Sequence, residues 1–220
     1  MKKIKRGIYQ LKKDMDSIIK KSYEDIFKSI TELCKAYLKN SVNDAKAIEE
    51  KIYDQYYAAF EKAYSQTSSS LKKIYKKVLP YDIKKINDLT YSEDGIQFED
   101  RVQKYFDEAK NNIDIHTEQI VKQKLRYGLY RILDTEVKNI SETVKKHKKP
   151  IPEDGLYIIQ VIEGCGGDCD VDCLSYNGEY PEDEDIPWPP YHPSCTGIGY
   201  YDYTDIPDEI EDLDLNDENI

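Results

Sequence analysis

The sequence predicts a mainly α-helical protein of the α+β class. In it, a long antiparallel helical hairpin and further helices precede a small β-containing Cys/His knuckle and an acidic tail. Apolar residues recur at helical spacing through residues 1–150, a β-branched run and four cysteines follow in 151–200, and acidic residues are frequent in 201–220. We therefore divide the chain into a hairpin (1–80), a helical domain (81–150), a strand with the knuckle (151–200) and the tail (201–220).

The first helix is expected over the first 37 or so residues. Its apolar residues follow one another at alternating steps of four and three, the spacing of a coiled-coil seam. Ile19 and Tyr23 cover the step at Ser22, and Cys34 beside the seam is expected to be an inert core thiol. The seam residues are Ile4, Ile8, Leu11, Met15, Ile18, Ile26, Ile30, Leu33 and Tyr37.

A polar turn at Asn40–Asp44 separates this helix from a second one, which should pass a weak point at Ser68–Ser70 and stop at Pro80. The short connection makes the two helices antiparallel neighbours, about 50 Å long at about 1.5 Å per residue. A further helix is expected from about Ile96 to a basic last turn before Pro150. Either Gly128 or the Asn111-Asn112 pair could divide it.

Beyond Pro152 the pattern changes. Leu156–Ile162 is a β-branched run bounded by glycines, which is typical of a strand. The chain also holds 20 Tyr but only four Phe. Because a tyrosine ring brings a hydroxyl that needs a partner, we expect many of these rings at helix seams with one edge reaching water. This composition favours an elongated or assembling protein.

Charge is divided unevenly along the chain. All 32 Lys and Arg residues lie in 1–150 against 23 acidic ones, so that part carries +9, while 151–220 holds 20 acidic residues and no basic one. The two parts should attract each other or different partners. The basic N-terminus lacks the apolar run of a signal peptide, and no stretch is apolar enough to span a bilayer, so we expect no membrane association.

The cysteines predict a metal site. In a reducing cytosol, clustered cysteines more often bind metal than form disulfides. Tetrahedral zinc takes two ligand pairs from two short knuckles, and Cys169, Cys173, His192 and Cys195 have that spacing. Cys165 competes for the place of Cys169. A disulfide, an unordered segment and a catalytic metal are the alternatives.

We expect this zinc to be structural and the protein to have no enzymatic activity. Four protein ligands leave no open position for water, and no phosphate-binding loop, nucleophile elbow or Ser/His/Asp set is present in the sequence. Four prolines in Ile186–Pro193 make a stiff, extended strap that presents His192. Trp188 in the strap should be the core of the small knuckle, which needs the metal as a staple.

The segments from Cys173 to Tyr180 and from Pro187 to Cys195 resemble the C-terminal motif of the Mu F-like phage head morphogenesis family, also called minor head or minor capsid proteins. The family reads approximately C-x-x-L-D-G-K-V-F, a variable stretch, then P-P-x-H-P-N-C-R-C. Asn177-Gly178 keeps the turn chemistry of the family's Asp-Gly, a hairpin signal. Upstream, Leu133–Val137 resembles the family's helical R-T-E segment, with Asp134 at the Arg position. Gly197 stands where the family has a further cysteine.

The resemblance implies a virion component of the phage head, located in the host cytoplasm during assembly. It would act in head morphogenesis or genome delivery, with portal or major capsid proteins as partners. Homo-oligomers could form through the helical seams, and Lys-rich edges could contact packaged DNA. These edges are Lys72, Lys73, Lys76, Lys77 and Lys145–Lys149. The alternatives are a cytosolic zinc-knuckle module that regulates a partner or binds nucleic acid, and an enzyme or toxin.

Overall fold

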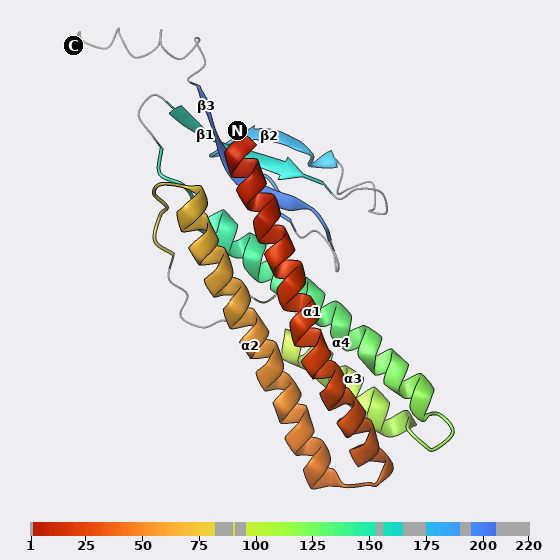
Figure 1. The fold of residues 1–220 in the computed structure, drawn as a ribbon. Helices are drawn as coiled ribbons and strands as arrows, with labels where there is room; N and C mark the ends of the chain where they lie inside the picture. The colour runs from red at the N-terminus through yellow and green to blue at the C-terminus, as the bar shows by residue number, and fades with distance from the viewer. Residues whose placement is uncertain are drawn as a thin grey trace, which may run out of the picture.

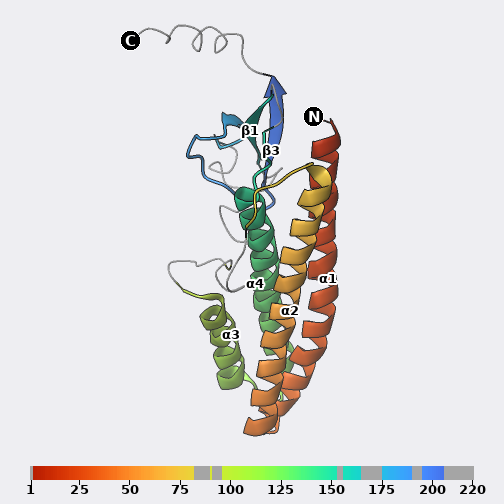
Figure 2. The ribbon, with the colours of Figure 1, turned by 90° about the vertical axis from the view of Figure 1, so that its left-hand side faces the viewer.

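The computed structural model describes residues 2–81, 90, 96–152, 156–164, 175–189 and 195–205. Three long helices lie side by side, a shorter helix packs beside them, and a small sheet caps the end of the bundle where the chain begins (Figures 1 and 2). The predicted class, mainly helical with a small β-containing part, is confirmed, and the β part is an antiparallel sheet. Most of the predicted Cys/His knuckle and of the acidic tail lies outside the described residues. Within the described residues, no helix is long and apolar enough to cross a bilayer.

The predicted hairpin is formed by α1 (Lys2–Leu38) and α2 (Val42–Ile74). Asn40 ends α1 with a positive φ of 52°, while the Asn40 N–H donates to Tyr37 O and the Ser41 N–H donates to Ala36 O. These two bonds are those of a Schellman motif, which turns the chain sharply at a helix end. The seam is buried as predicted, with one difference: Ile19 is buried and Ile18 lies at its edge.

Two details of α2 differ from the prediction. The helix continues through Ser68–Ser70 without interruption, and it ends at Ile74, before the expected stop at Pro80. The backbone of Tyr75 is extended, and its hydroxyl donates to the carbonyl of Tyr201 in the sheet at 2.6 Å. α2 therefore ends at the point where the Tyr75 side chain bonds to the sheet.

The third predicted helix is divided into α3 (Phe98–Asn112) and α4 (Glu118–His147). The break follows Asn112, where Asp114 Oδ1 accepts hydrogen bonds from the N–H groups of His116 and Thr117, both at 2.8 Å. Such a side-chain turn competes with helical hydrogen bonds. Gly128 lies inside α4, where a Cβ atom would stand 2.2 Å from the ring of Tyr105 on α3.

Tyrosine and phenylalanine rings fill the seams between these helices, as the composition predicts. Phe98 packs edge-on against Tyr57 and Phe60. The hydroxyl of buried Tyr56 donates to Leu129 O at 2.6 Å, and that of Tyr57 donates to the Glu99 carboxylate at 2.7 Å. Each ring therefore joins two helices through both its apolar area and its hydroxyl.

The Leu133–Val137 segment lies in the interior of the bundle. Glu136 is fully buried and forms an ion pair with Arg101 of α3. Asp134 pairs with Lys138 one turn later, at 2.8 Å. The acidic side chains of this segment therefore join α4 to α3 and to its own next turn.

The sheet has the strand order β2-β1-β3 and is antiparallel throughout, with β1 at Leu156–Glu163, β2 at Gly178–Pro181 and β3 at Ile198–Asp205. The strand predicted at Leu156–Ile162 is therefore confirmed. β3 extends to Asp205 and so occupies positions that we assigned to the tail. Gly178 pairs with Ile162, so Asn177-Gly178 closes the long connection 164–177 and is not a two-residue hairpin turn.

Candidate functional site at the bundle–sheet junction

Of the four predicted zinc ligands, the structure describes only Cys195. Cys169, Cys173 and His192 lie outside the described residues, as does the competing Cys165. Among the residues that are described, no three His, Cys, Asp or Glu side chains gather in a metal-binding group. The site is therefore built from Cys195 and from the chain that surrounds it.

Cys195 precedes β3 and its thiol is buried. Its Sγ accepts a hydrogen bond from the N–H of Gly197, with 3.4 Å between N and S. Outer hydrogen bonds of this kind commonly orient metal-bound side chains. The local backbone at Cys195 therefore suits a zinc ligand.

Two segments carry the other predicted ligands: a first segment, 165–174, and a second segment, 190–194. The described residues that flank these two segments come together near Cys195. A Cβ atom at Gly197 would lie 3.4 Å from Cys195 Sγ and 3.5 Å from both Glu163 O and Pro189 Cβ. Glu163 ends β1, shortly before the first segment, and Pro189 comes directly before the second. The N–H of Gly164 also donates to Asn177 Oδ1 at 3.2 Å, which draws together the two ends of the first segment.

Trp188 and Gln160 hold the chain that leads into the second segment. The Trp188 ring packs on Tyr201 of β3 with 5.3 Å between ring centroids, and a Cβ atom at Gly199 would stand 2.4 Å from the indole. Gln160 Nε2 donates to the carbonyls of Pro181 at 2.7 Å and Glu184 at 2.8 Å. Trp188 is partly buried and packs on β3 and the main core, so its role as the core of a separate knuckle stays a prediction.

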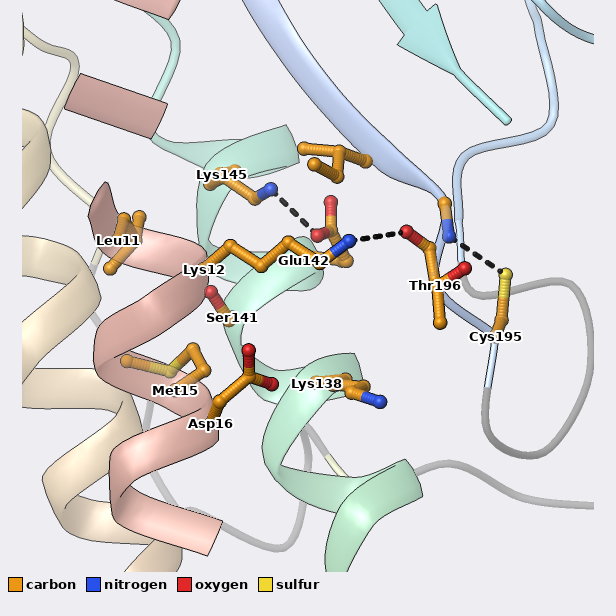
Figure 3. Close-up of a pocket in the computed structure, with 12 residues that line it drawn as sticks. Leu11, Lys12, Met15, Asp16, Lys138, Ser141, Glu142, Lys145, Cys195 and Thr196 are labelled. Carbon is orange, nitrogen blue, oxygen red and sulfur yellow. Dashed lines mark hydrogen bonds and ion pairs between the residues drawn. The ribbon is translucent and has the colours of Figure 1, made fainter. Parts of the chain in front are cut away.

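A small cavity of about 30 Å³ lies behind Cys195, between α1, α4 and the start of β3 (Figure 3). One water molecule needs about 10–15 Å³ of such volume, so the cavity suits one or two waters and is too small for an organic substrate. Lys12 crosses above it and donates to Thr196 O at 3.0 Å. The lining residues are Leu11, Lys12, Met15, Asp16, Lys138, Ser141, Glu142, Lys145, Cys195, Thr196, Gly197 and Ile198.

A buried ion pair forms one wall of the cavity. Lys145 Nζ lies 2.6 Å from Glu142 Oε1, and the other carboxylate oxygen accepts the N–H of Gly199 at 3.1 Å (Figure 3). Burial raises the pKa of Glu142, and Lys145 and the Gly199 N–H offset only part of that rise. Burial likewise lowers the pKa of Lys145, while Glu142 opposes the shift. The pair joins α4 to β3 just beside Cys195.

A second carboxylate joins α1 to the sheet. Glu163 Oε1 lies 2.8 Å from Lys5 Nζ and accepts the Tyr200 hydroxyl at 2.8 Å, and Glu163 Oε2 accepts the Tyr9 hydroxyl at 2.5 Å. Burial tends to raise the pKa of Glu163, but the three hydrogen bonds together lower it, so the carboxylate stays charged. The start of α1 is thereby fixed to the last residue of β1.

Sequence reasoning missed both carboxylate sites. One signal was present: Glu142 and Lys145 are three residues apart, the spacing of an ion pair on one helix face. That face lies opposite apolar Ile140 and Val144, and it is buried because β3 covers it. The prediction for Lys145–Lys149 as an exposed basic edge is wrong at two positions. Lys145 and Lys148 are buried, because the sheet covers the last turns of α4.

The arrangement around Cys195 is a rigid joint with a water-sized cavity. Lys12, Glu142 and Glu163 each hold one structural element against another. Comparison with family models, curated proteins and solved structures finds no match to this chain.

Proposed function

We propose that this chain is a phage minor head protein, a non-enzymatic structural component that acts in head morphogenesis or genome delivery near the portal. The single observation that carries the proposal is the motif in which Cys173 is followed by the Pro-Pro-Tyr-His-Pro-Ser-Cys run ending at Cys195. The likeness is confined to short motifs in the second half of the chain.

We also propose that the knuckle binds one structural zinc through Cys169, Cys173, His192 and Cys195, with Cys165 as the competitor for the first place. Two features of the described chain support this proposal: the N–H···S bond to Cys195, and the meeting of both segment ends beside it. Bound zinc would staple two segments that sequence places about twenty residues apart.

Contact with packaged DNA through lysines is retained only for the end of α2. Lys72 and Lys73 in the last turn of α2, and Lys76 and Lys77 just after it, are exposed, whereas Lys145 is buried against Glu142. Exposed lysines on a helix end attract phosphates, with an affinity that falls as salt rises.

The location in the particle is tested by purifying phage from a producing host on a density gradient and digesting the particles for mass spectrometry. Peptides of this chain should co-migrate with the particles at a few copies per head and should survive nuclease and high-salt washes. Absence from washed particles, with the chain present in the cell lysate, refutes the head protein and favours the regulatory zinc-knuckle module.

The zinc is tested separately by elemental analysis of protein purified under reducing conditions. We expect about one zinc per chain, lost in a Cys173→Ser, His192→Ala double variant. Gly197→Cys places a thiol beside Cys195 and restores the family's second cysteine, so it should slow zinc removal by a chelator. A natively folded protein that contains no zinc, and in which all five thiols react with a thiol reagent, would disprove the structural zinc. That result would leave the head-protein proposal unaffected.

A further inference from the structure

The exposed face of the N-terminal half of α4 combines cations with apolar rings, and we name it the basic–aromatic strip. The N-terminal half of α4 lies along the outer edge of the bundle (Figure 1). Tyr127 is 64% exposed and Ile120 58% exposed. Its members are Ile120, Lys122, Lys124, Arg126, Tyr127, Tyr130 and Arg131.

The four cations of the strip have no acidic partner in the described chain. No ion pair joins Lys122, Lys124, Arg126 or Arg131 to any described carboxylate, whereas Lys5, Lys51, Arg101, Lys138, Lys145 and Lys149 are all paired. No acidic residue occurs in 119–133 of α4. Carboxylates of α3 lie beside the strip without an ion pair to it: Asp100 and Glu108 line the same surface hollow as Arg131, and Glu108 also lines one with Lys124. On the other side, Asp16 and Asp134 lie near Tyr130.

Aromatic rings lie beside three of these cations, Lys122, Arg126 and Arg131. The guanidinium of Arg126 lies 3.8 Å from the centroid of the Phe27 ring on α1, and its buried Nε has no acceptor among the described residues. Arg131 stands 5.9 Å from the ring of Tyr127. Cations fixed over rings lose less side-chain entropy when an anionic partner binds, so the strip is prepared for an acidic ligand.

The chain itself contains a segment of matching chemistry. Residues 206–220 hold seven Asp and Glu and no Lys or Arg. Apolar side chains are interspersed among these acids, at Ile206, Ile210, Leu213, Leu215 and Ile220. An acidic segment with regular apolar residues complements a surface on which cations alternate with exposed Ile and Tyr.

The position of β3 decides which copy supplies the segment. The Tyr201 hydroxyl donates to Lys146 O, and from there β3 runs about 13 Å away from the bundle to Asp205 (Figure 2). From Lys146 back to Tyr127, α4 extends about 28 Å at about 1.5 Å per residue. Fifteen residues reach about 50 Å when fully extended. A chain's own segment would therefore be stretched almost taut to reach its strip.

We propose that the basic–aromatic strip binds the acidic segment 206–220 of a second copy of this chain. Each copy offers one strip and one segment, so the contact is head-to-tail and can continue from copy to copy. The proposal does not depend on the function proposed above.

The test is sedimentation velocity of the full chain at 50 and 500 mM salt over a range of concentrations. Wild type should associate at low salt. Its association constant should fall by about tenfold or more at high salt, because screening weakens exposed ion pairs. Lys124→Glu with Arg131→Glu, and separately a chain ending at Asp205, should each be monomeric. The matched control is Lys46→Glu with Lys62→Glu, an equal charge change on exposed lysines of α2, which should associate like wild type.

Mixing the two monomeric variants gives the decisive result. The strip variant keeps its acidic segment and the shortened chain keeps its strip, so the mixture should form one-to-one dimers and nothing larger. Docking within one chain predicts a wild type that stays monomeric at low salt and would overturn the proposal. A mixture that forms no dimer, association of the shortened chain alone, or equal loss in the control would overturn it as well. If wild type stays monomeric while only the strip variant loses affinity for a DNA oligonucleotide, the strip is a nucleic-acid surface and the proposal is wrong.

Discussion

Breaking the buried pair at the bundle–sheet junction should destabilise the protein with opposite pH dependences for its two partners. Removing one member of a buried ion pair leaves an uncompensated charge and typically costs about 3–5 kcal/mol. Lys145 and Glu142 are both almost fully buried and lie 2.6 Å apart, so either single change meets this condition. For a chain of this size, about 2–4 °C per kcal/mol predicts a fall in Tm of about 6–20 °C.

The sign of the pH dependence follows from which charge remains. In Lys145→Met, Glu142 keeps a raised pKa, so the folded state holds a proton that the unfolded state has lost. The penalty is therefore smallest below about pH 4 and grows as pH rises. In Glu142→Gln, buried Lys145 has a lowered pKa, so the penalty is present at neutral pH and falls as pH rises towards about 10.

The assay is urea denaturation of wild type, both single variants and the Glu142→Gln, Lys145→Met double variant, from pH 5 to 9. Subtracting the wild-type free energy of unfolding at each pH cancels the contribution of other titrating groups. The double variant should cost clearly less than the sum of the singles, because it leaves no buried charge and Gln can still accept the Gly199 N–H. Additive costs, or the same pH slope in both singles, would refute the reasoning.

Three further predictions concern the bundle. Gly128→Ala should destabilise by about 1–2 kcal/mol, because its Cβ atom would meet the Tyr105 ring. In a Tyr105→Ala background the same change should stabilise the protein slightly, because Ala has a higher helix propensity than Gly. Urea denaturation midpoints measure both effects, and destabilisation in both backgrounds would contradict the contact with Tyr105. Tyr75→Phe should cost about 1–3 kcal/mol in thermal melts, since Tyr201 O loses a buried donor, and an unchanged Tm would argue against that bond. Cys34, whose pKa burial raises to about 11, should react with a thiol reagent at pH 8 only as fast as the protein unfolds; rapid labelling of its peptide in the native state would contradict its burial.

The helices were the most predictable part of the fold. The four–three spacing from Ile4 to Tyr37 required one buried stripe, and α1 has it. Where the prediction failed, a contact distant in sequence was responsible. α2 ends early where Tyr75 binds the carbonyl of Tyr201, and the Asn177-Gly178 pair closes a long connection because β2 pairs in register with the end of β1.

The candidate site was less predictable, and the reason is again distance along the chain. Cysteine and histidine spacing named four ligands, of which Cys195 alone lies in the described chain. Nothing in local sequence indicates that Gly197 donates to its sulfur or that Glu163 O and Pro189 come within 3.5 Å of the same point. These neighbours come from β1 and from the strap, and only strand pairing brings them together.

The sequence by itself determined the helical hairpin, the strand at Leu156 and the division of charge, because each follows from residues close together in the chain. The tertiary structure alone decided which charged side chains are buried and which form ion pairs. It buried Lys145 against Glu142 and placed Glu163 under three donors. It left Lys122, Lys124, Arg126 and Arg131 without an ion pair to any carboxylate among the described residues. Periodicity shows which face of a helix is apolar, but the pairing of a charge depends on elements that arrive from elsewhere in the chain.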